Sequence, residues 1–291
     1  MSQMTKDNHE PLFIGKIQYT NAWPVFHHFH PEQLRTSAEL VTKVPAVLNR
    51  RITEGLLDMS AMSSFAYASA AEHLLILPQL SVSVDGAVKS ILLFSRKPLE
   101  EIRNGRIALT NTSATSINLL KILMSRYLGG KPEYFDCEPD LDTMMRQADA
   151  ALLIGDHAIR ASWANEDYVV TDLGALWKEW TGHSMTFAVW AVRREVAEHR
   201  PEAVAEIVEA FHASKRQSLE NLTPVIEQAM KDIGGTETYW KQYFTNLCYD
   251  FGKREQSGLE LYLRYAHEMG LLAQEINLEL WNDNMLIRVK E

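Results

Sequence analysis

The sequence lacks the features that mark disulfide-bonded, membrane-spanning and nucleic-acid-binding proteins. Its two cysteines, Cys137 and Cys248, lie far apart without metal-ligand spacing, so we expect buried thiols in a reducing compartment and no disulfide framework or zinc site. No run of about 18 apolar residues occurs, which argues against a transmembrane helix. The formal net charge is −9 and no basic run is present, so nucleic acid is not an expected partner.

Signals for secretion and for the common nucleotide and hydrolase sites are also missing. The polar segment at residues 1–13 has no apolar core of the kind found in secretory signals, so we expect a cytoplasmic protein without a membrane partner. The chain has no P-loop, no GxGxxG, no zinc signature and no Ser-His-Asp order. A small molecule is therefore the expected partner, and the oligomeric state stays open.

Alternating strands and helices make up most of the chain. With 46% hydrophobic residues it can bury a large core, in one large or two ordinary domains. Hydrophobic periodicity predicts strands at 13–18, 40–44, 57–62, 75–84 and 88–96, with a hairpin turn at Asp85-Gly86. A second run of strands follows at 106–110, 134–137, 150–154, 168–171 and 185–193. The pattern predicts an α/β protein with mainly parallel sheets.

This order of elements predicts two lobes with a cleft between them. We expect residues 12–96 and 190–291 to form lobe 1 and residues 97–189 to form lobe 2. Everything beyond Pro201 reads as helix, and these C-terminal helices are expected to pack back on lobe 1. Their apolar stripes, such as Tyr239, Tyr243 and Leu247, are interpreted as core faces and not as ligand-binding surfaces.

The segment from Arg106 to Leu123 is the most informative in the chain. It reads as a strand, a short polar turn and a helix that begins near Ser113. Hydroxyl or amide side chains gather where the helix leaves backbone N–H groups unpaired: Thr110, Asn111, Thr112, Ser113, Thr115 and Ser116. Because the helix dipole and the free N–H groups favour negative charge there, this is a candidate anion site. Ordinary helix capping is the alternative.

Three other predicted strands also run directly into polar helix starts. They lead to Asn21, to Ser63-Ser64 and to Gly155-Asp156-His157, while Lys89-Ser90 follows the turn at Asp85-Gly86. Ligands of open α/β sheets bind beyond the carboxyl ends of the strands, so facing lobes would bring these residues to one cleft. Each also has a plain structural alternative, with Asn21 or Asp156 as a helix cap and Lys89 as a solvated surface charge.

Five segments, in order along the chain, resemble the chorismate dehydratase family of the futalosine route to menaquinone. They are YTNAWP at residues 19–24, DGAVKSILLFS at 85–95, NTSATS at 111–116, IGDHA at 154–158 and TFAVWA at 186–191. Each segment is short, and their number and order make the resemblance specific. It implies a periplasmic-binding-protein-like type II fold, with two lobes about a two-strand hinge.

The resemblance also implies an activity and a set of site residues. The family dehydrates chorismate, a dianion, to 3-[(1-carboxyvinyl)oxy]benzoate, so the expected enzyme is a hydro-lyase that needs no cofactor and no metal. The implied catalytic residues are Asn21, Ser90 and Asp156. The implied substrate-binding residues are Ser63, Ser64, Lys89, Asn111, Thr112, Ser113, Thr115, Ser116, His157 and Phe187.

Several alternatives stay open at this point. One is a small-anion-binding or sensor protein of the same fold, although no secretion signal or DNA-binding helix-turn-helix is visible. Another is the sibling enzyme that makes 1,4-dihydroxy-6-naphthoate, against which the Asn21 motif argues. The general base is Asp156, His157 or the enolpyruvyl carboxylate of the substrate itself. Asparagine is not a base, so Asn21 is expected to orient the substrate or to donate a hydrogen bond.

Overall fold

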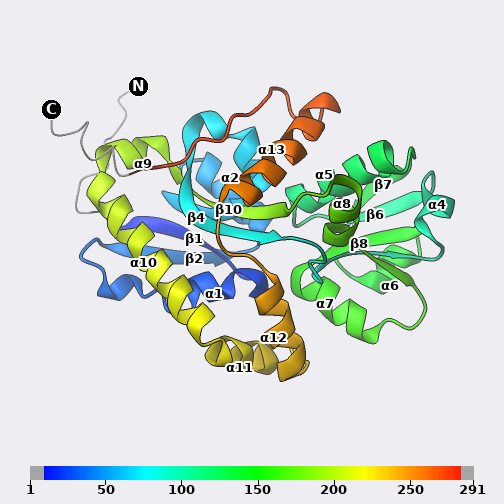
Figure 1. The fold of residues 1–291 in the computed structure, drawn as a ribbon, viewed down its shortest axis with the longest axis horizontal. Coiled ribbons are helices and arrows are strands. Elements are labelled where there is room, and N and C mark those ends of the chain that lie inside the picture. Colours follow the sequence, from blue (N-terminus) through cyan, green and yellow to red (C-terminus); the bar gives the residue numbers. More distant parts are fainter. Residues whose placement is uncertain (1–9, 283–291) are drawn as a thin grey trace.

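Two five-stranded sheets lie next to each other in the computed structural model, which describes residues 10–282 (Figure 1). The first sheet has the order β2-β1-β3-β10-β4 and the second has the order β7-β6-β8-β5-β9. The strands are β1 Leu12–Ile17, β2 Ala38–Lys43, β3 Met59–Ser63, β4 Leu74–Val84, β5 Ile91–Ser95, β6 Arg106–Thr110, β7 Glu133–Cys137, β8 Ala150–Ile154, β9 Val169–Asp172 and β10 Met185–Arg193. We call each sheet, with the helices packed on it, a lobe.

The middle of each sheet is formed by strands without exposed residues. Every residue of β3, β5 and β8 is buried, as expected for strands that helices cover on both faces. The edge strands differ, because β2 is at least partly exposed along its length and β9 presents Val169 and Val170 to solvent. The edge strand β4 is an exception, because only Pro78 and Gln79 among its residues are not buried.

The chain crosses between the sheets earlier than the sequence predicted. β5 lies in the second sheet, antiparallel to β8 and β9, whereas β4 lies in the first. The predicted hairpin at Asp85-Gly86 is therefore wrong, and residues 85–90 form a crossing. All of β10 pairs with β3 and β4 in the first sheet, so residues 185–189 also differ from their predicted placement. An apolar run identifies a strand but not its partners. The assignment of residue ranges to two domains stays a prediction.

Short helices cover both sheets. Those of the first lobe are α1 Trp23–Phe26, α2 Pro45–Thr53, α3 Ser64–Ser69 and α9 Arg194–His199, with 3-10 turns at Thr20–Ala22, Pro31–Gln33 and Ala71–His73. Those of the second are α4 Leu99–Ile102, α5 Ala114–Ile122, continued by a π turn at Leu123–Tyr127, α6 Leu141–Met145, α7 Gly155–Ala164 and α8 Leu173–Thr181. Within residues 10–282, no helix has the length and apolar character that crossing a membrane requires.

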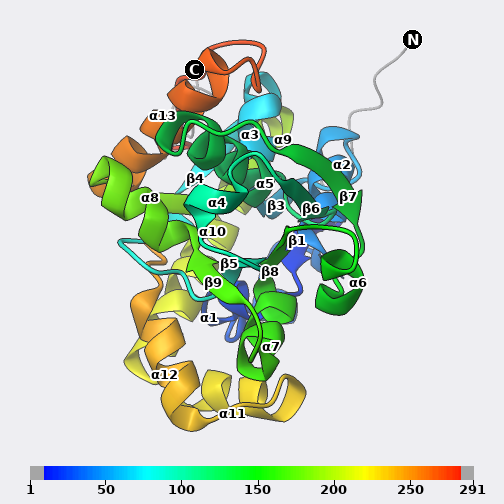
Figure 2. The ribbon, with the colours of Figure 1, turned by 90° about the vertical axis from the view of Figure 1, so that its right-hand side faces the viewer.

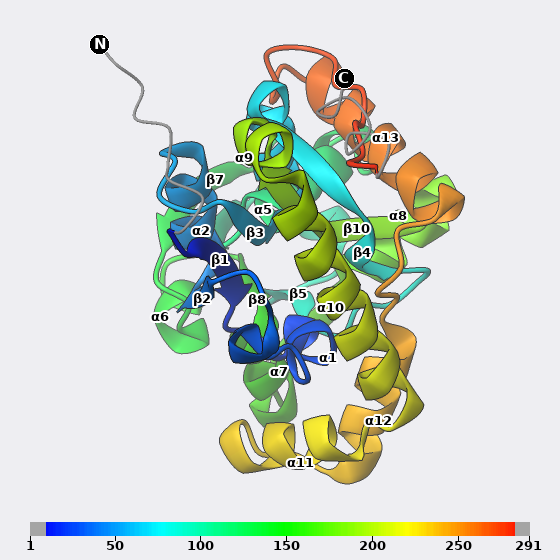
Figure 3. The same ribbon diagram turned by 90° about the vertical axis from the view of Figure 1, so that its left-hand side faces the viewer.

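The C-terminal helices are α10 Pro201–Glu220, α11 Thr223–Asp232, α12 Glu237–Asn246 and α13 Lys253–Glu268. α10 packs on α1 and β4, and α13 packs on β10, which agrees with the expected packing on the first lobe (Figure 3). α11 and α12 in addition reach α7 of the second lobe (Figure 2). There Arg160 donates to the carbonyl of Asp232 at 3.0 Å, and the Trp163 ring meets that of Trp240 edge-on.

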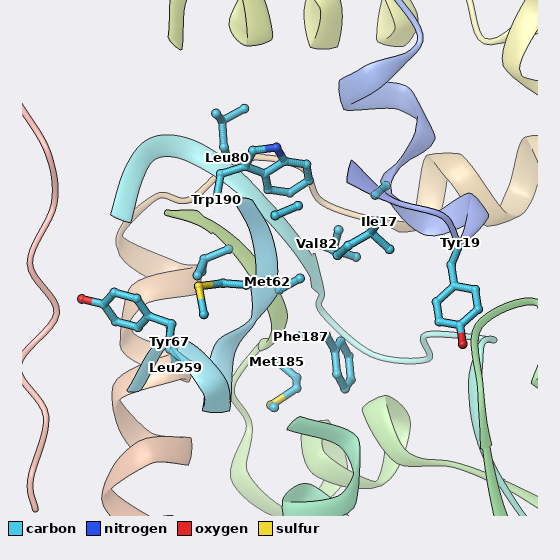
Figure 4. Close-up of a cluster of buried hydrophobic side chains, with 14 of the residues drawn as sticks. Ile17, Tyr19, Met62, Tyr67, Leu80, Val82, Met185, Phe187, Trp190 and Leu259 are labelled. Atoms are coloured by element: carbon cyan, nitrogen blue, oxygen red, sulfur yellow. The ribbon is translucent and has the colours of Figure 1, made fainter. Parts of the chain in front are cut away.

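One hydrophobic cluster extends from the first sheet into the second lobe. Figure 4 shows part of it, with Met62 and Trp190 inside the first lobe and the rings of Phe187 and Tyr19 toward the second. Burial on this scale contributes about 25 cal/mol for each Å² of apolar surface removed from water. The same cluster therefore stabilises the first sheet and supports the junction between the lobes.

A carboxylate clamp holds α10 against the loop before β2. Glu206 accepts hydrogen bonds from the backbone N–H groups of Arg35 and Thr36 and from their side chains, at 2.7–3.2 Å. Partial burial would raise the pKa of Glu206, but these hydrogen bonds outweigh it and lower the pKa to about 2. The clamp thus depends on the ionised carboxylate.

We expect acid to weaken this clamp. Because the folded-state pKa of about 2 lies below the ordinary value of 4.5, its stabilisation is complete above pH 4.5 and is lost as the pH falls toward 2. Glu206→Gln should lower the Tm near neutral pH and reduce its fall in acid, as measured by thermal melts across this range. Glu209→Gln is the control, since Glu209 lies on the same helix with a side chain that is 77% exposed. Equal effects of the two substitutions would contradict the clamp.

Candidate active site between the lobes

A pocket at the junction of the lobes is lined by residues that end or follow four strands. Asn21 follows β1, Ser63 ends β3, Ser113 and Ser116 follow β6, and Gly155 follows β8. The remaining wall residues are Ile17, Tyr19, Pro45, Ile91, Ile154, Phe187 and Ala188. The structure thus brings these residues of the predicted strand ends to one pocket, whereas Ser64, Asp156 and His157 are not in its wall.

The hydroxyl-rich start of α5 is divided between two tasks. Ser113 caps the helix, its hydroxyl accepting from the N–H of Ser116 at 3.4 Å, and the two hydroxyls lie 3.2 Å apart at the pocket. The Thr115 hydroxyl instead accepts from the N–H of Phe65 at 3.0 Å, on α3 of the first lobe. Ser113 and Ser116 thus face the pocket, while Thr115 ties the lobes together.

Three other predicted binding residues are bonded elsewhere. Thr112 pairs with the hydroxyl of Thr110 at 2.9 Å, and the exposed Asn111 donates to Glu138 at 2.7 Å. Ser64 donates to the carbonyl of Thr186 at 2.8 Å. None of these side chains belongs to the pocket wall in the described structure. Their contact with substrate stays a prediction.

Asn21 does not cap the next helix, contrary to one sequence-based alternative. The helix begins one residue before Pro24, with Ala22 at its cap position and no side-chain cap hydrogen bond. The amide oxygen of Asn21 is buried at the pocket and has no hydrogen-bond partner within residues 10–282. A buried polar atom without a partner is costly, and because an amide oxygen only accepts, a hydrogen-bond donor of a ligand is its natural partner.

Asp156 links the two lobes. Its Oδ1 accepts from the Thr20 hydroxyl at 2.6 Å and from the Thr20 N–H at 3.3 Å, and Thr20 lies on the opposite lobe. Burial raises the pKa of Asp156, and the hydrogen bonds from Thr20 act in the opposite direction. The neighbouring His157 is exposed and lines a surface groove between α6 and α7. Both residues therefore lie beside the pocket and not in its wall.

The crossing between β4 and β5 holds Lys89 in the left-handed conformation, with φ +62°. That conformation costs about 1–2 kcal/mol for a residue with a Cβ. Asp172 offsets the cost, since its carboxylate accepts from the N–H groups of Val88 at 3.0 Å and Lys89 at 2.6 Å. Ser90 follows, fully buried, with the Tyr243 hydroxyl donating to its Oγ at 2.9 Å. Binding and catalytic roles for Lys89 and Ser90 stay predictions.

The pocket is polar without being charged. Among the residues that the structure describes, its wall includes no Lys, Arg, His, Asp or Glu side chain. Three helices instead direct their N-termini toward it, since Pro45 opens α2, Ser113 caps α5 and Gly155 opens α7. Free N–H groups and aligned peptide dipoles at such ends favour anions. In residues 10–282, no cluster of three or more His, Cys, Asp or Glu could hold a metal ion.

Sequence reasoning missed two polar residues of this site. Tyr19 is 2% exposed in the pocket wall, and its hydroxyl lies near Thr112 without forming a regular hydrogen bond in the described chain. Its membership of the YTNAWP segment was the available signal. Asn49 of α2 holds Ser63 through both ends of its amide, at 3.1 and 3.2 Å. Nothing in the sequence pattern connects Asn49 with Ser63.

The free volume of the pocket is about 30 Å³. This is room for one or two water molecules, whereas ligand pockets usually measure about 300–1,000 Å³. A ring with two carboxylates needs more space, so such a ligand enters only when the lobes move apart or the wall rearranges.

Two lobes joined by two crossings, with a polar pocket between them, define the periplasmic-binding-protein-like type II class of fold. Protein AF1704 from Archaeoglobus fulgidus superposes with a TM-score of 0.74, at 19% identity over 90% of this chain and 98% of that chain. The periplasmic aliphatic sulphonate binding protein SsuA from Escherichia coli gives a TM-score of 0.68, at 14% identity over 94% of this chain and 92% of that chain. At these identities the likeness concerns the fold alone.

Closer relationships come from the sequence comparisons. Residues 12–268 match the family described as "Menaquinone biosynthesis". Chorismate dehydratase from Thermus thermophilus is 33% identical over 276 residues, which cover 90% of this chain and 96% of that protein. The chain therefore belongs to the menaquinone biosynthesis family, as the order of its five short segments indicated.

Gly155 tests how closely the lobes approach. Its φ is +57°, and a Cβ there would meet the Tyr19 ring at 2.9–3.1 Å. Gly129 has a similar φ of +61° but nothing within 4 Å of a Cβ. Gly129→Ala should cost about 1–2 kcal/mol from backbone strain alone. Gly155→Ala should cost about 1–3 kcal/mol more, because the ring must move, and denaturant unfolding of both variants measures the difference. Equal losses would argue against a tight contact.

Proposed function

We propose that this chain is a chorismate dehydratase, a lyase that converts chorismate to 3-[(1-carboxyvinyl)oxy]benzoate and water. The observation that carries the proposal is the pocket at which Asn21, Ser63, Ser113 and Ser116 converge, in a chain of the menaquinone biosynthesis family. The relative from Thermus thermophilus, named chorismate dehydratase, supports the same activity.

The electrostatics of the pocket suit this substrate. Chorismate carries two carboxylates, and the N-termini of α2, α5 and α7 point at the pocket from both lobes. Helix N-termini and hydroxyl donors stabilise an anion without fixing a cation next to it. Such a site can bind a dianion and still respond to charge that develops during the reaction.

The reaction removes a proton from C3 and hydroxide from C4. Loss of the proton spreads charge onto the ring carboxylate as an enolate, and loss of the hydroxide then makes the ring aromatic. The proton and the hydroxide together account for the water released. The enzyme must therefore hold two carboxylates, stabilise the enolate and manage two proton transfers.

The arrangement of side chains guides the proposed roles. Ser113 and Ser116 donate to one carboxylate, and Asn21 donates to the enolate or the leaving hydroxyl. No carboxylate or histidine lies in the described wall, and Asp156 already accepts from Thr20. We therefore assign removal of the C3 proton to the enolpyruvyl carboxylate of the substrate, and a closed pocket would protect the enolate from water.

The direct test is incubation of the purified protein with chorismate. We expect an aromatic product with the ultraviolet spectrum and retention time of 3-[(1-carboxyvinyl)oxy]benzoate, formed at the same rate with and without EDTA. Binding of chorismate without turnover would overturn the proposal in favour of a binding or sensor protein. The expected cytoplasmic location remains a prediction.

Asn21 offers a sharper test, because its buried amide oxygen has no hydrogen-bond partner within residues 10–282. Asn21→Ala should leave the Tm nearly unchanged and lower kcat on the order of a hundredfold, since it removes a donor to charge that develops in the transition state. Asn104→Ala is the control, because the exposed Asn104 side chain accepts from the N–H of Lys131 outside the pocket wall and should not affect turnover. A fully active Asn21→Ala enzyme would refute the catalytic role of Asn21.

A further inference from the structure

We propose that Tyr243, on the C-terminal helix α12, is a positioning residue that orients the hydroxyl of Ser90 for the reaction. This inference deepens the proposed function and rests on it. The sequence pattern placed Tyr243 in an apolar stripe and assigned it to the core alone. In the structure, the hydroxyl at the end of that ring also makes a polar contact with Ser90. Helix α12 is thus far from Ser90 in sequence but contacts it in the fold.

The contact joins two completely buried side chains. The Tyr243 hydroxyl donates to Ser90 Oγ at 2.9 Å, and both residues have no exposed surface. Ser90 Oγ is 3.5 Å from the carbonyl of Val88, at the limit for a hydrogen bond. The Ser90 carbonyl accepts from the N–H of Gly155 at 2.7 Å, and both Gly155 and Ile91 line the pocket. Ser90 therefore lies directly behind the pocket wall.

The chemistry of the two hydroxyls indicates which of them donates the hydrogen bond. Burial raises the pKa of the Tyr243 phenol, so its proton stays in place at working pH. Because Tyr243 donates, the Ser90 oxygen accepts on that side, and its own hydrogen is left with only the weak contact to Val88. Ser90 is fully buried in this structure, so its hydrogen reaches a ligand only once the wall has rearranged to admit one. It can then turn from Val88 to a negatively charged group, which accepts a stronger hydrogen bond than a neutral carbonyl does.

Both partners are held in place by their surroundings. The Tyr243 ring lies parallel to that of Tyr239 at 6.1 Å and edge-on to that of Trp240 at 5.5 Å. Asn246, on the same helix, donates to the carbonyl of Ala87 just before Ser90. On the other side of the crossing, Asp172 holds the backbone of residues 88–89. Because Tyr243 is held rigidly, it fixes the rotamer of the Ser90 hydroxyl, which would otherwise sample several orientations.

Tyr243→Phe is the direct test, because it keeps the ring and removes the donor. We expect kcat for chorismate to fall on the order of ten- to a hundredfold, since a misoriented group loses rate. We expect KM to change by less than about twofold, because the interaction matters in the transition state. Tyr239→Phe is the matched control, since its ring stacks on Tyr243 but its hydroxyl has no hydrogen-bond partner within residues 10–282. It should behave like the wild type.

A double-mutant cycle separates positioning from a merely structural role. If Tyr243 acts through Ser90, adding Tyr243→Phe to Ser90→Ala should lower kcat no further than Ser90→Ala alone. The double variant removes both partners, so it leaves no unpaired hydroxyl and is expected to fold even if Tyr243→Phe alone does not. Full activity of Tyr243→Phe, or additive losses in the cycle, would overturn the positioning role while leaving the proposed function intact. A wild-type protein that leaves chorismate unchanged would overturn both.

Discussion

The site depends on one buried contact between the lobes, the hydrogen bonds from the backbone and hydroxyl of Thr20 to the carboxylate of Asp156. Taking a carboxylate out of water is expensive, and it is tolerated only where donors replace the lost hydration. Here both donors come from the opposite lobe, and they replace part of the hydration that Asp156 lacks when the lobes are together. A second bond across the junction, from the Phe65 N–H to Thr115, acts in the same sense. These contacts bring the polar ends of strands from both sheets to one pocket.

The closed junction explains why the pocket is neutral and small. A lysine or arginine in its wall would need a counter-charge whenever the pocket is empty, whereas helix N-termini and serine hydroxyls remain partly satisfied by their own caps, as Ser113 is with Ser116. In this chain the pocket between the lobes is lined with donors suited to negative charge. The same design serves binding or elimination chemistry, so fold alone does not distinguish them. Membership of the menaquinone biosynthesis family and the residues of the pocket favour the elimination.

The C-terminal helices do more than cover the first sheet. α10 and α13 pack on it, but α11 and α12 also contact the second lobe through Arg160 and Trp163. Through Tyr243 they reach Ser90 at the crossing between the lobes. A residue 153 positions away in sequence thus touches a candidate catalytic serine. The helical third of the chain therefore contacts both lobes and the crossing between them.

The sequence by itself determined the class of fold and the segments that form the site. Apolar periodicity marked each strand, and polar residues at strand ends marked Asn21, Ser63, Ser113 and Ser116, because period and end chemistry are local properties. Tertiary structure alone decided which sheet β5 joins, since an apolar strand pairs equally well with many partners. It also decided which hydroxyls of residues 110–116 face the pocket, which cap the helix and which bond to the other lobe. Finally, it brought Tyr243 into contact with Ser90. Such assignments depend on side-chain contacts between distant segments, which no local pattern encodes.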